Sequence, residues 1–114
     1  MNLGTFEERR IRIKEIKLVA EALYEAKAKD DEILRVLMKV CDIDRETAMT
    51  ALQDEKFIYS PSRELYQYLI LEKGFDAHDA DEFAKNARTL LVGNTELSKV
   101  SPAKMFNSIN KANR

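Results

Sequence analysis

The sequence predicts an all-α protein: a compact bundle of five or six helices, one arrangement of which is two helical hairpins after a long N-terminal helix. Apolar residues recur at steps of three and four along most of the 114 residues, which is the spacing of a helix face that packs inward. Residues that start helices recur between these stretches, and the chain holds only 3 glycines and 2 prolines. No segment alternates with the two-residue period of a β-strand.

The first helix is expected to begin at Thr5, because Thr5 and Glu8 have the spacing of a capping box. It is expected to run to about Lys29. Its buried stripe consists of apolar residues three and four positions apart, with one neighbour beside them: Ile13, Ile16, Val19, Ala20, Leu23 and Ala26.

A helical hairpin is expected to follow this helix. Asp30 and Asp31 predict the start of a helix over residues 31–40, since acidic side chains cap helix N-termini and favour the positive end of the helix dipole. Residues 41–43 form a short turn, after which Asp44 is the expected N-cap of the next helix. The buried side of that helix consists of Ala48, Ala51 and Leu52.

The second half of the chain begins with an apolar connector, residues 57–59. Ser60 and Pro61 are the N-cap and first-turn pair of a helix over residues 61–73, because proline's missing N–H is harmless there. The helix is expected to stop at Gly74, which adopts the left-handed conformation without a Cβ penalty.

Two more helices are expected before the C-terminus. Asp76 is the expected N-cap of a helix that ends at Gly93 and Asn94, and its apolar stripe is the most regular in the chain: Ala80, Phe83, Ala84, Ala87, Leu90 and Leu91. Ser101 and Pro102 then start a short last helix, whose apolar residues are Met105, Phe106 and Ile109.

The two hairpins share a weak sequence similarity. A shift of 32 residues superposes four identical pairs and two similar ones: Glu32 on Glu64, Leu37 on Leu69, Asp44 on Asp76, Ala48 on Ala80, Ile43 on Phe75 and Ile33 on Leu65. Such a period occurs in helical-pair repeats. Two hairpins in one bundle give the same pattern without a duplication, and we favour that interpretation.

Bulk properties predict one cytoplasmic domain spanning residues 1–114, with 1–4 and 111–114 frayed. No stretch reaches the roughly 18 to 20 apolar residues of a membrane span, and the N-terminus lacks the apolar region of a secretion signal. Cys41, the only cysteine, cannot form an internal disulfide. A net charge of −1 does not indicate a globally basic nucleic-acid binder.

The sequence predicts no catalytic, cofactor-binding or metal-binding residues. His78 is the only histidine, so His78 and Glu82 at i, i+4 lack the third ligand that a zinc site needs. Asp42, Asp44 and Glu46 imitate the start of a calcium loop, but Thr47 replaces its glycine and Gln53 its bidentate glutamate. Enzymatic activity is therefore not expected, and an enzyme with a site assembled between helices ranks third among the functions considered.

Residues 37–52 resemble the helix-turn-helix of DNA-binding regulators. The resemblance implies that Ile43 and Ala48 pack inward and that the outer face of residues 44–53 reads DNA through Arg45, Glu46, Met49, Thr50 and Gln53. Asp42 departs from the pattern, because glycine is usual at that turn position. Nearby carboxylates would also repel phosphates, so a plain hairpin is favoured and DNA binding is the alternative.

Helix 61–73 is either the central helix of the bundle or, as we slightly favour, the contact surface for a protein partner or a second copy of the chain. It is apolar on nearly all sides between Leu65 and Leu71, and tyrosines are enriched in interfaces. The predicted partner-binding residues are Phe57, Tyr59, Tyr66, Tyr68 and Ile70. We therefore expect a non-catalytic regulatory or adaptor protein, with neither membrane binding nor a small-molecule substrate indicated.

Overall fold

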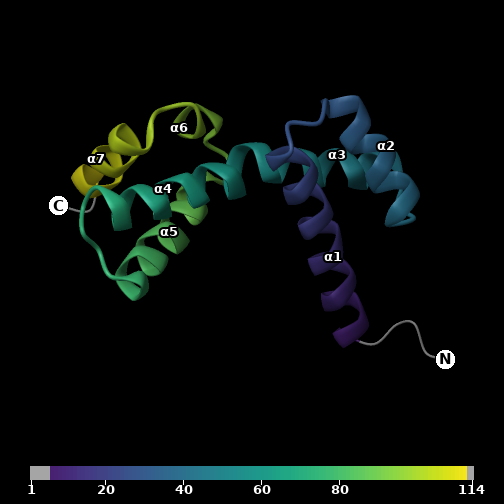
Figure 1. Cartoon of the computed structure of the whole chain (residues 1–114), viewed down its shortest axis with the longest axis horizontal. Helices are drawn as coiled ribbons and strands as arrows, with labels where there is room; N and C mark the ends of the chain where they lie inside the picture. The colour runs from purple at the N-terminus through teal and green to yellow at the C-terminus, as the bar shows by residue number, and fades with distance from the viewer. Residues whose placement is uncertain (1–5, 113–114) are drawn as a thin grey trace. The chain divides into compact units, whose positions relative to one another are not determined.

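The computed structural model describes residues 6–112 and is all-α over that range, which confirms the predicted fold class (Figure 1). Six helices have ten or more residues, and a four-residue helix and a π-helical turn complete them. None of these helices is long and apolar enough to cross a membrane. The residues outside the described part are 1–4, Thr5 and 113–114, and the last helix includes Lys111.

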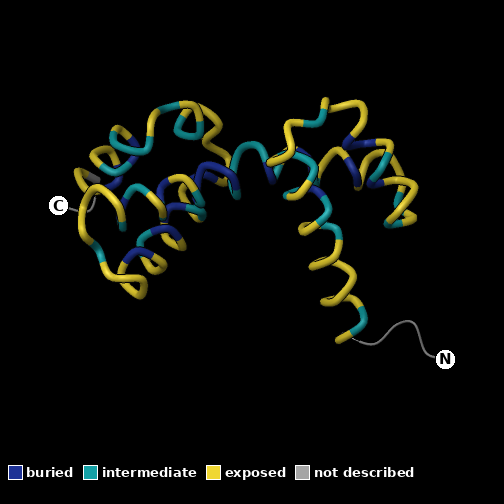
Figure 2. The backbone as a smooth tube through the Cα atoms, viewed as in Figure 1, coloured by how far each residue is buried: buried dark blue, intermediate teal, exposed yellow. Residues whose placement is uncertain are grey.

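The chain divides into two compact units, Met1–Glu55 and Lys56–Arg114. The first unit consists of α1 (Phe6–Glu25), α2 (Asp30–Val40) and α3 (Arg45–Asp54), and α1 contacts both other helices. Its core consists of six buried residues: Ala20, Ile33, Leu34, Leu37, Ala48 and Leu52. Buried segments of the backbone are dark blue in Figure 2. Each unit thus has its own core, and the single domain expected from the sequence stays a prediction.

Helix α1 ends at Glu25, four residues earlier than predicted. Lys27 has a φ of 62°, and its N–H donates to the carbonyl of Tyr24 while the N–H of Ala28 donates to that of Leu23. This is a Schellman motif, in which a left-handed residue satisfies the last carbonyls of the helix. The sequence concealed it because lysine stands where glycine is usual, and Ala26 is consequently exposed rather than buried.

In the α2–α3 hairpin, the predicted N-cap of α3 is correct and the predicted N-cap of α2 is wrong. The carboxylate of Asp44 accepts a hydrogen bond from the N–H of Thr47 at 2.8 Å, so the predicted N-cap of α3 is confirmed. Helix α2 begins one residue earlier than expected, with Lys29 as its N-cap. Asp30 and Asp31 therefore lie in the first turn, where their charge favours the helix dipole without capping it.

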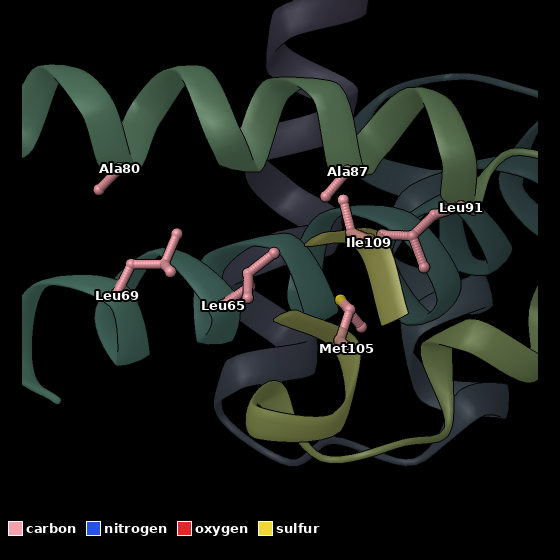
Figure 3. Packing of buried hydrophobic residues seen from close by; sticks show 7 residues of the cluster. All are labelled: Leu65, Leu69, Ala80, Ala87, Leu91, Met105 and Ile109. Atoms are coloured by element: carbon pink, nitrogen blue, oxygen red, sulfur yellow. The ribbon is translucent and has the colours of Figure 1, made fainter. Parts of the chain in front are cut away.

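The second unit contains α4 (Ser60–Leu71), α5 (Ala77–Leu91), α6 (Thr95–Ser98) and α7 (Pro102–Ala112). Helix α4 contacts both α5 and α7. Figure 3 shows the buried side chains that these helices contribute: Leu65, Leu69, Ala80, Ala87, Leu91, Met105 and Ile109. Ser62 is also buried, and its hydroxyl accepts from Arg88 Nη1 at 3.0 Å and donates to the carbonyl of Ala84 at 3.4 Å.

Two predicted boundaries in this unit are wrong. Residues 57–59 belong to a π-helical turn, η1 (Glu55–Tyr59), which leads directly into α4, so Tyr59 rather than Ser60 is the N-cap. A residue inside continuous helical backbone has no free N–H groups to cap, and Ser60 is buried instead. Helix α4 ends at Leu71, two residues before the predicted Lys73, although Gly74 has the expected positive φ of 70°.

The starts of α5 and α7 agree with the sequence. The carboxylate of Asp76 accepts from the N–H of Asp79 at 2.8 Å, and the hydroxyl of Ser101 accepts from that of Lys104 at 3.3 Å. Leu90, which was assigned to the buried stripe of α5, is 44% exposed. Helix α5 ends at Leu91 with Val92 as its C-cap, and Gly93 follows with a positive φ of 78°. Asn94 caps the short α6, which the sequence did not reveal.

The 32-residue similarity extends to the structure of the two hairpins, α2–α3 and α4–α5. Asp42 and Gly74, which are 32 positions apart, both have positive φ, and Asp44 and Asp76 make equivalent cap hydrogen bonds. Three of the four aligned apolar pairs are fully buried in both hairpins: Ile33 and Leu65, Leu37 and Leu69, Ala48 and Ala80. The fourth pair, Ile43 and Phe75, is half-buried in both. The hairpins therefore share a turn and a core pattern, although α4 ends one residue earlier in this register.

Candidate functional site

The predicted aromatic surface is half-buried. Tyr66, Tyr68 and Ile70 pack against the core of the second unit, beside the fully buried Leu65 and Leu69. Positions 65 and 69 therefore lie on the fully buried face of α4, and positions 66 and 70 on a neighbouring, half-buried face. Phe57 and Tyr59, also half-buried, lie on η1, where the Nζ of Lys56 lies 5.9 Å from the Phe57 ring centroid. Partner contact through these residues stays a prediction.

Part of this surface is occupied by a cluster of rings within the second unit. The ring of Tyr68 lies 6.3 Å from that of Phe106, which in turn lies 5.3 Å from Phe83 and 6.0 Å from Phe75. The Nζ of Lys73 sits 5.2 Å from the Phe106 centroid. Tyr68 thus contributes to the packing of its own unit, which leaves less of its ring available to a partner.

The α2–α3 hairpin places the residues of the helix-turn-helix pattern as the resemblance implies. Ala48 is buried and Ile43 half-buried, and the positive φ of 52° at Asp42 reproduces the backbone for which glycine is usual. The five residues named as a reading surface are all exposed on α3: Arg45, Glu46, Met49, Thr50 and Gln53. Their contact with DNA stays a prediction, because exposure alone is shared by any outward helix face.

A hollow that the sequence did not reveal lies between α1 and the end of α2. It measures about 470 Å³, and its apolar lining includes Ile11 and Val40, which are 58% and 66% exposed. The charged and remaining lining residues surround these two: Glu8, Arg9, Arg12, Glu15, Ile16, Cys41 and Asp42. Ile13, predicted to be buried, is 59% exposed, so the N-terminal part of α1 leaves apolar side chains uncovered (Figure 2).

Helix length explains this exposure. Helix α1 has 20 residues, or roughly 30 Å, whereas α2 has 11 and α3 has 10, or roughly 15 Å each. The two shorter helices cannot cover the whole of α1, so its first turns lack apolar contacts. The mismatch between predicted helix lengths was the available signal, but stripe periodicity alone assigns Ile13 to the core.

Arg12 links α1 to the C-terminal end of α2 at one side of this hollow. Its Nη2 donates to the carbonyl oxygens of Cys41 at 3.2 Å and Asp42 at 3.0 Å, which follow the last turn of α2. A cation at a helix C-terminus is favoured by the helix dipole. Burial raises the pKa of the half-buried Cys41 thiol, and Glu15 raises this pKa further, while Arg12 lowers it.

A second hollow of the first unit, of about 440 Å³, lies between α2 and the start of α3. Three basic residues line it, Arg35, Lys39 and Arg45, with Met38 and Leu34 as its apolar part. Asp31 is the remaining lining residue. The arrangement combines positive charge with an apolar surface.

The structure shows the residues considered as metal ligands to be exposed. His78 Nε2 lies 3.8 Å from Glu82 Oε1, with side chains 81% and 68% exposed. Within residues 6–112, no three His, Cys, Asp or Glu side chains are grouped so that they could hold a metal ion. Compared with known protein families, curated proteins and solved structures, the chain shows no significant match.

Proposed function

We propose that the chain is a non-catalytic regulatory or adaptor protein that works in the cytoplasm by binding a protein partner through the hollow beside α1. The observation that supports this proposal is the exposed apolar pair Ile11 and Val40, contributed by separate helices to one concave surface. Isolated exposed apolar residues are normal on a protein, but apolar residues gathered in a hollow with a charged border are typical of an interaction site.

Burial of this apolar surface by a partner contributes favourable free energy to binding. Complete burial of an isoleucine or valine side chain contributes roughly 1.5 to 3 kcal/mol, and Ile11 and Val40 are more than half exposed. Arg9, Arg12, Glu8 and Glu15 border the apolar part and provide charges of both signs for orientation. A partner segment with one or two apolar anchors therefore fits the surface.

Affinity capture from native lysate tests the proposal with a matched pair of variants. Ile11→Gln/Val40→Gln removes apolar area from the hollow while retaining helix-compatible side chains, and Leu71→Gln alters a 78% exposed leucine outside it. We expect wild type and Leu71→Gln to retain the same partner and the double variant to retain it about tenfold less well. Equal capture by all three would contradict the proposal, and light scattering identifies a second copy as the partner.

DNA binding through α3 is the second candidate, favoured by the left-handed Asp42 in the turn and the exposure of Arg45 and Gln53. A mobility shift with mixed genomic DNA at increasing salt tests it, since phosphate contacts make binding fall steeply with salt. If this candidate holds, Arg45→Ala and Gln53→Ala lose base discrimination and stay folded. Absence of a shift at low salt would remove it.

A further inference from the structure

The hollow between α2 and the start of α3 concentrates positive charge that the fold does not use. Arg35, Lys39 and Arg45 line its 440 Å³ and are exposed. The side chain of each of the three makes no hydrogen bond or ion pair with residues 6–112. The three cations outnumber the one carboxylate that lines the hollow, Asp31, so the lining carries a net positive charge.

The second hairpin provides an internal comparison for these residues. The second hairpin has the same buried apolar pattern and the same turn as the first. The positions that correspond to the three basic residues, 32 residues later in the chain, hold Gln67, Leu71 and Ala77. All three basic residues are thus replaced by uncharged ones in a hairpin of the same pattern. The positive charge is consequently not a requirement of this hairpin structure.

We propose that this hollow binds an acidic peptide segment, with Arg35, Lys39 and Arg45 contacting its carboxylates and Met38 contacting an apolar side chain beside them. Arginine donates to carboxylates in a planar, two-pronged geometry, and charge-assisted hydrogen bonds are about twice as strong as neutral ones. Met38 is 36% exposed next to the buried Leu34, and methionine adapts to ligands of varied shape.

The surroundings favour a peptide over nucleic acid. Asp31 lines the hollow, Asp30 and Glu32 share the first turn of α2 with it, and Glu46 follows Arg45 on α3. A continuous phosphate backbone passing through the hollow would meet these carboxylates and be repelled. A short segment whose negative charges are confined to one or two side chains avoids them.

The assignment to a protein ligand rests on the proposed function. The hollow beside α1 and the hollow between α2 and α3 nevertheless share no lining residue, so they can be tested separately.

The test titrates the full chain against a short fluorescein-labelled peptide of Glu and Leu and measures fluorescence anisotropy at low salt. A peptide with Gln in place of Glu is the reference. Arg35→Gln/Lys39→Gln is compared with Lys85→Gln/Lys104→Gln, which alters two exposed lysines of the other unit.

We expect wild type and the lysine control to bind the Glu peptide equally and the Arg35/Lys39 variant to bind it about tenfold less tightly. Equal binding by all three proteins, or no preference over the Gln peptide, would overturn the proposal. Displacement of the peptide by duplex DNA at lower concentration than by unlabelled peptide would also overturn it, in favour of nucleic acid. Ile11→Gln/Val40→Gln should bind this peptide as wild type does, so failure of one surface is distinguishable from failure of the other.

Discussion

Arg12 joins α1 to the end of α2 through two hydrogen bonds to backbone carbonyls. Carbonyls at a helix C-terminus have no partner within the helix, and the arginine supplies one while its charge complements the dipole. Burial raises the pKa of the Cys41 thiol, and two residues of α1 act on it in opposite directions: Glu15 raises this pKa and Arg12 lowers it.

The reactivity of Cys41 tests this local description. Burial and Glu15 raise the pKa of the thiol, so less thiolate is present at neutral pH than for an ordinary cysteine. Alkylation by iodoacetamide is expected to be slower than that of a free cysteine, and to reach half its maximal rate at a pH above the ordinary thiol pKa. Glu15→Gln should move that midpoint to lower pH. A midpoint below the ordinary value, or one unmoved by Glu15→Gln, would contradict the assigned environment.

The structural role of a single residue was predictable from the sequence where its side chain favours one particular backbone position, such as a helix N-cap or a left-handed turn. Asp44, Asp76 and Gly74 adopt the roles assigned from sequence, because short acidic side chains cap helices and glycine tolerates positive φ. Lys27 was not predictable, since its positive φ follows from the packing of α1 and not from any preference of lysine.

At the scale of elements, the two hairpins use one solution: a helix, a left-handed residue, an aspartate N-cap and a second helix. The contribution of the N-cap aspartate to stability can be measured directly by substitution. Asp44 and Asp76 each accept a backbone hydrogen bond at 2.8 Å, whereas Asp31 lies inside the first turn of α2.

Alanine substitutions of these aspartates distinguish the stabilisation by an N-cap hydrogen bond from that by a charge in the first helical turn. Asp76→Ala is expected to reduce the free energy of unfolding by about 1 kcal/mol, and Asp44→Ala to reduce it as well, while Asp31→Ala has a smaller effect. Chemical denaturation measures these differences. A larger loss for Asp31→Ala than for the other two would restore it as the cap of α2.

The contribution of Asp44 also depends on pH. Its hydrogen bonds with Thr47 lower its pKa in the folded chain, so the stabilisation is present above the ordinary aspartate pKa and is lost as pH falls through the lowered folded value. The difference between wild type and Asp44→Ala should therefore be constant near neutral pH and shrink in acid.

Helix boundaries were less predictable than helix existence. The π-helical turn η1 joins α3 to α4 without a break, so the Ser60 and Pro61 signal marked a true helical position but not a helix start. The hollow beside α1 was missed for a related reason. Periodicity identifies which face of a helix is apolar, but which part of that face is covered depends on the lengths of its neighbours.

At the scale of the whole molecule, the chain has two cores that share no residue. Ile33 belongs to the first and Ile109 to the second, and both are almost fully buried. The sequence predicted one domain because its length suits one core, and periodicity does not reveal which stripes meet each other.

Two matched substitutions test how far the cores are independent. Ile33→Val and Ile109→Val each remove one buried methylene at a cost of about 1 kcal/mol. Hydrogen exchange is expected to accelerate about fivefold in residues 6–55 for Ile33→Val and in residues 60–112 for Ile109→Val. Acceleration of the whole chain by either variant would show a single cooperative domain, as the sequence predicts.

The central claim, that the hollow beside α1 is the partner-binding surface, is tested most directly by hydrogen exchange of the chain alone and bound to its captured partner. Binding is expected to slow exchange in residues 8–18 and 38–42, which contain the lining residues Ile11 and Val40. Slowing confined to residues 57–70 would place the contact on the aromatic surface of Tyr59 and Tyr66 instead, and would contradict the account.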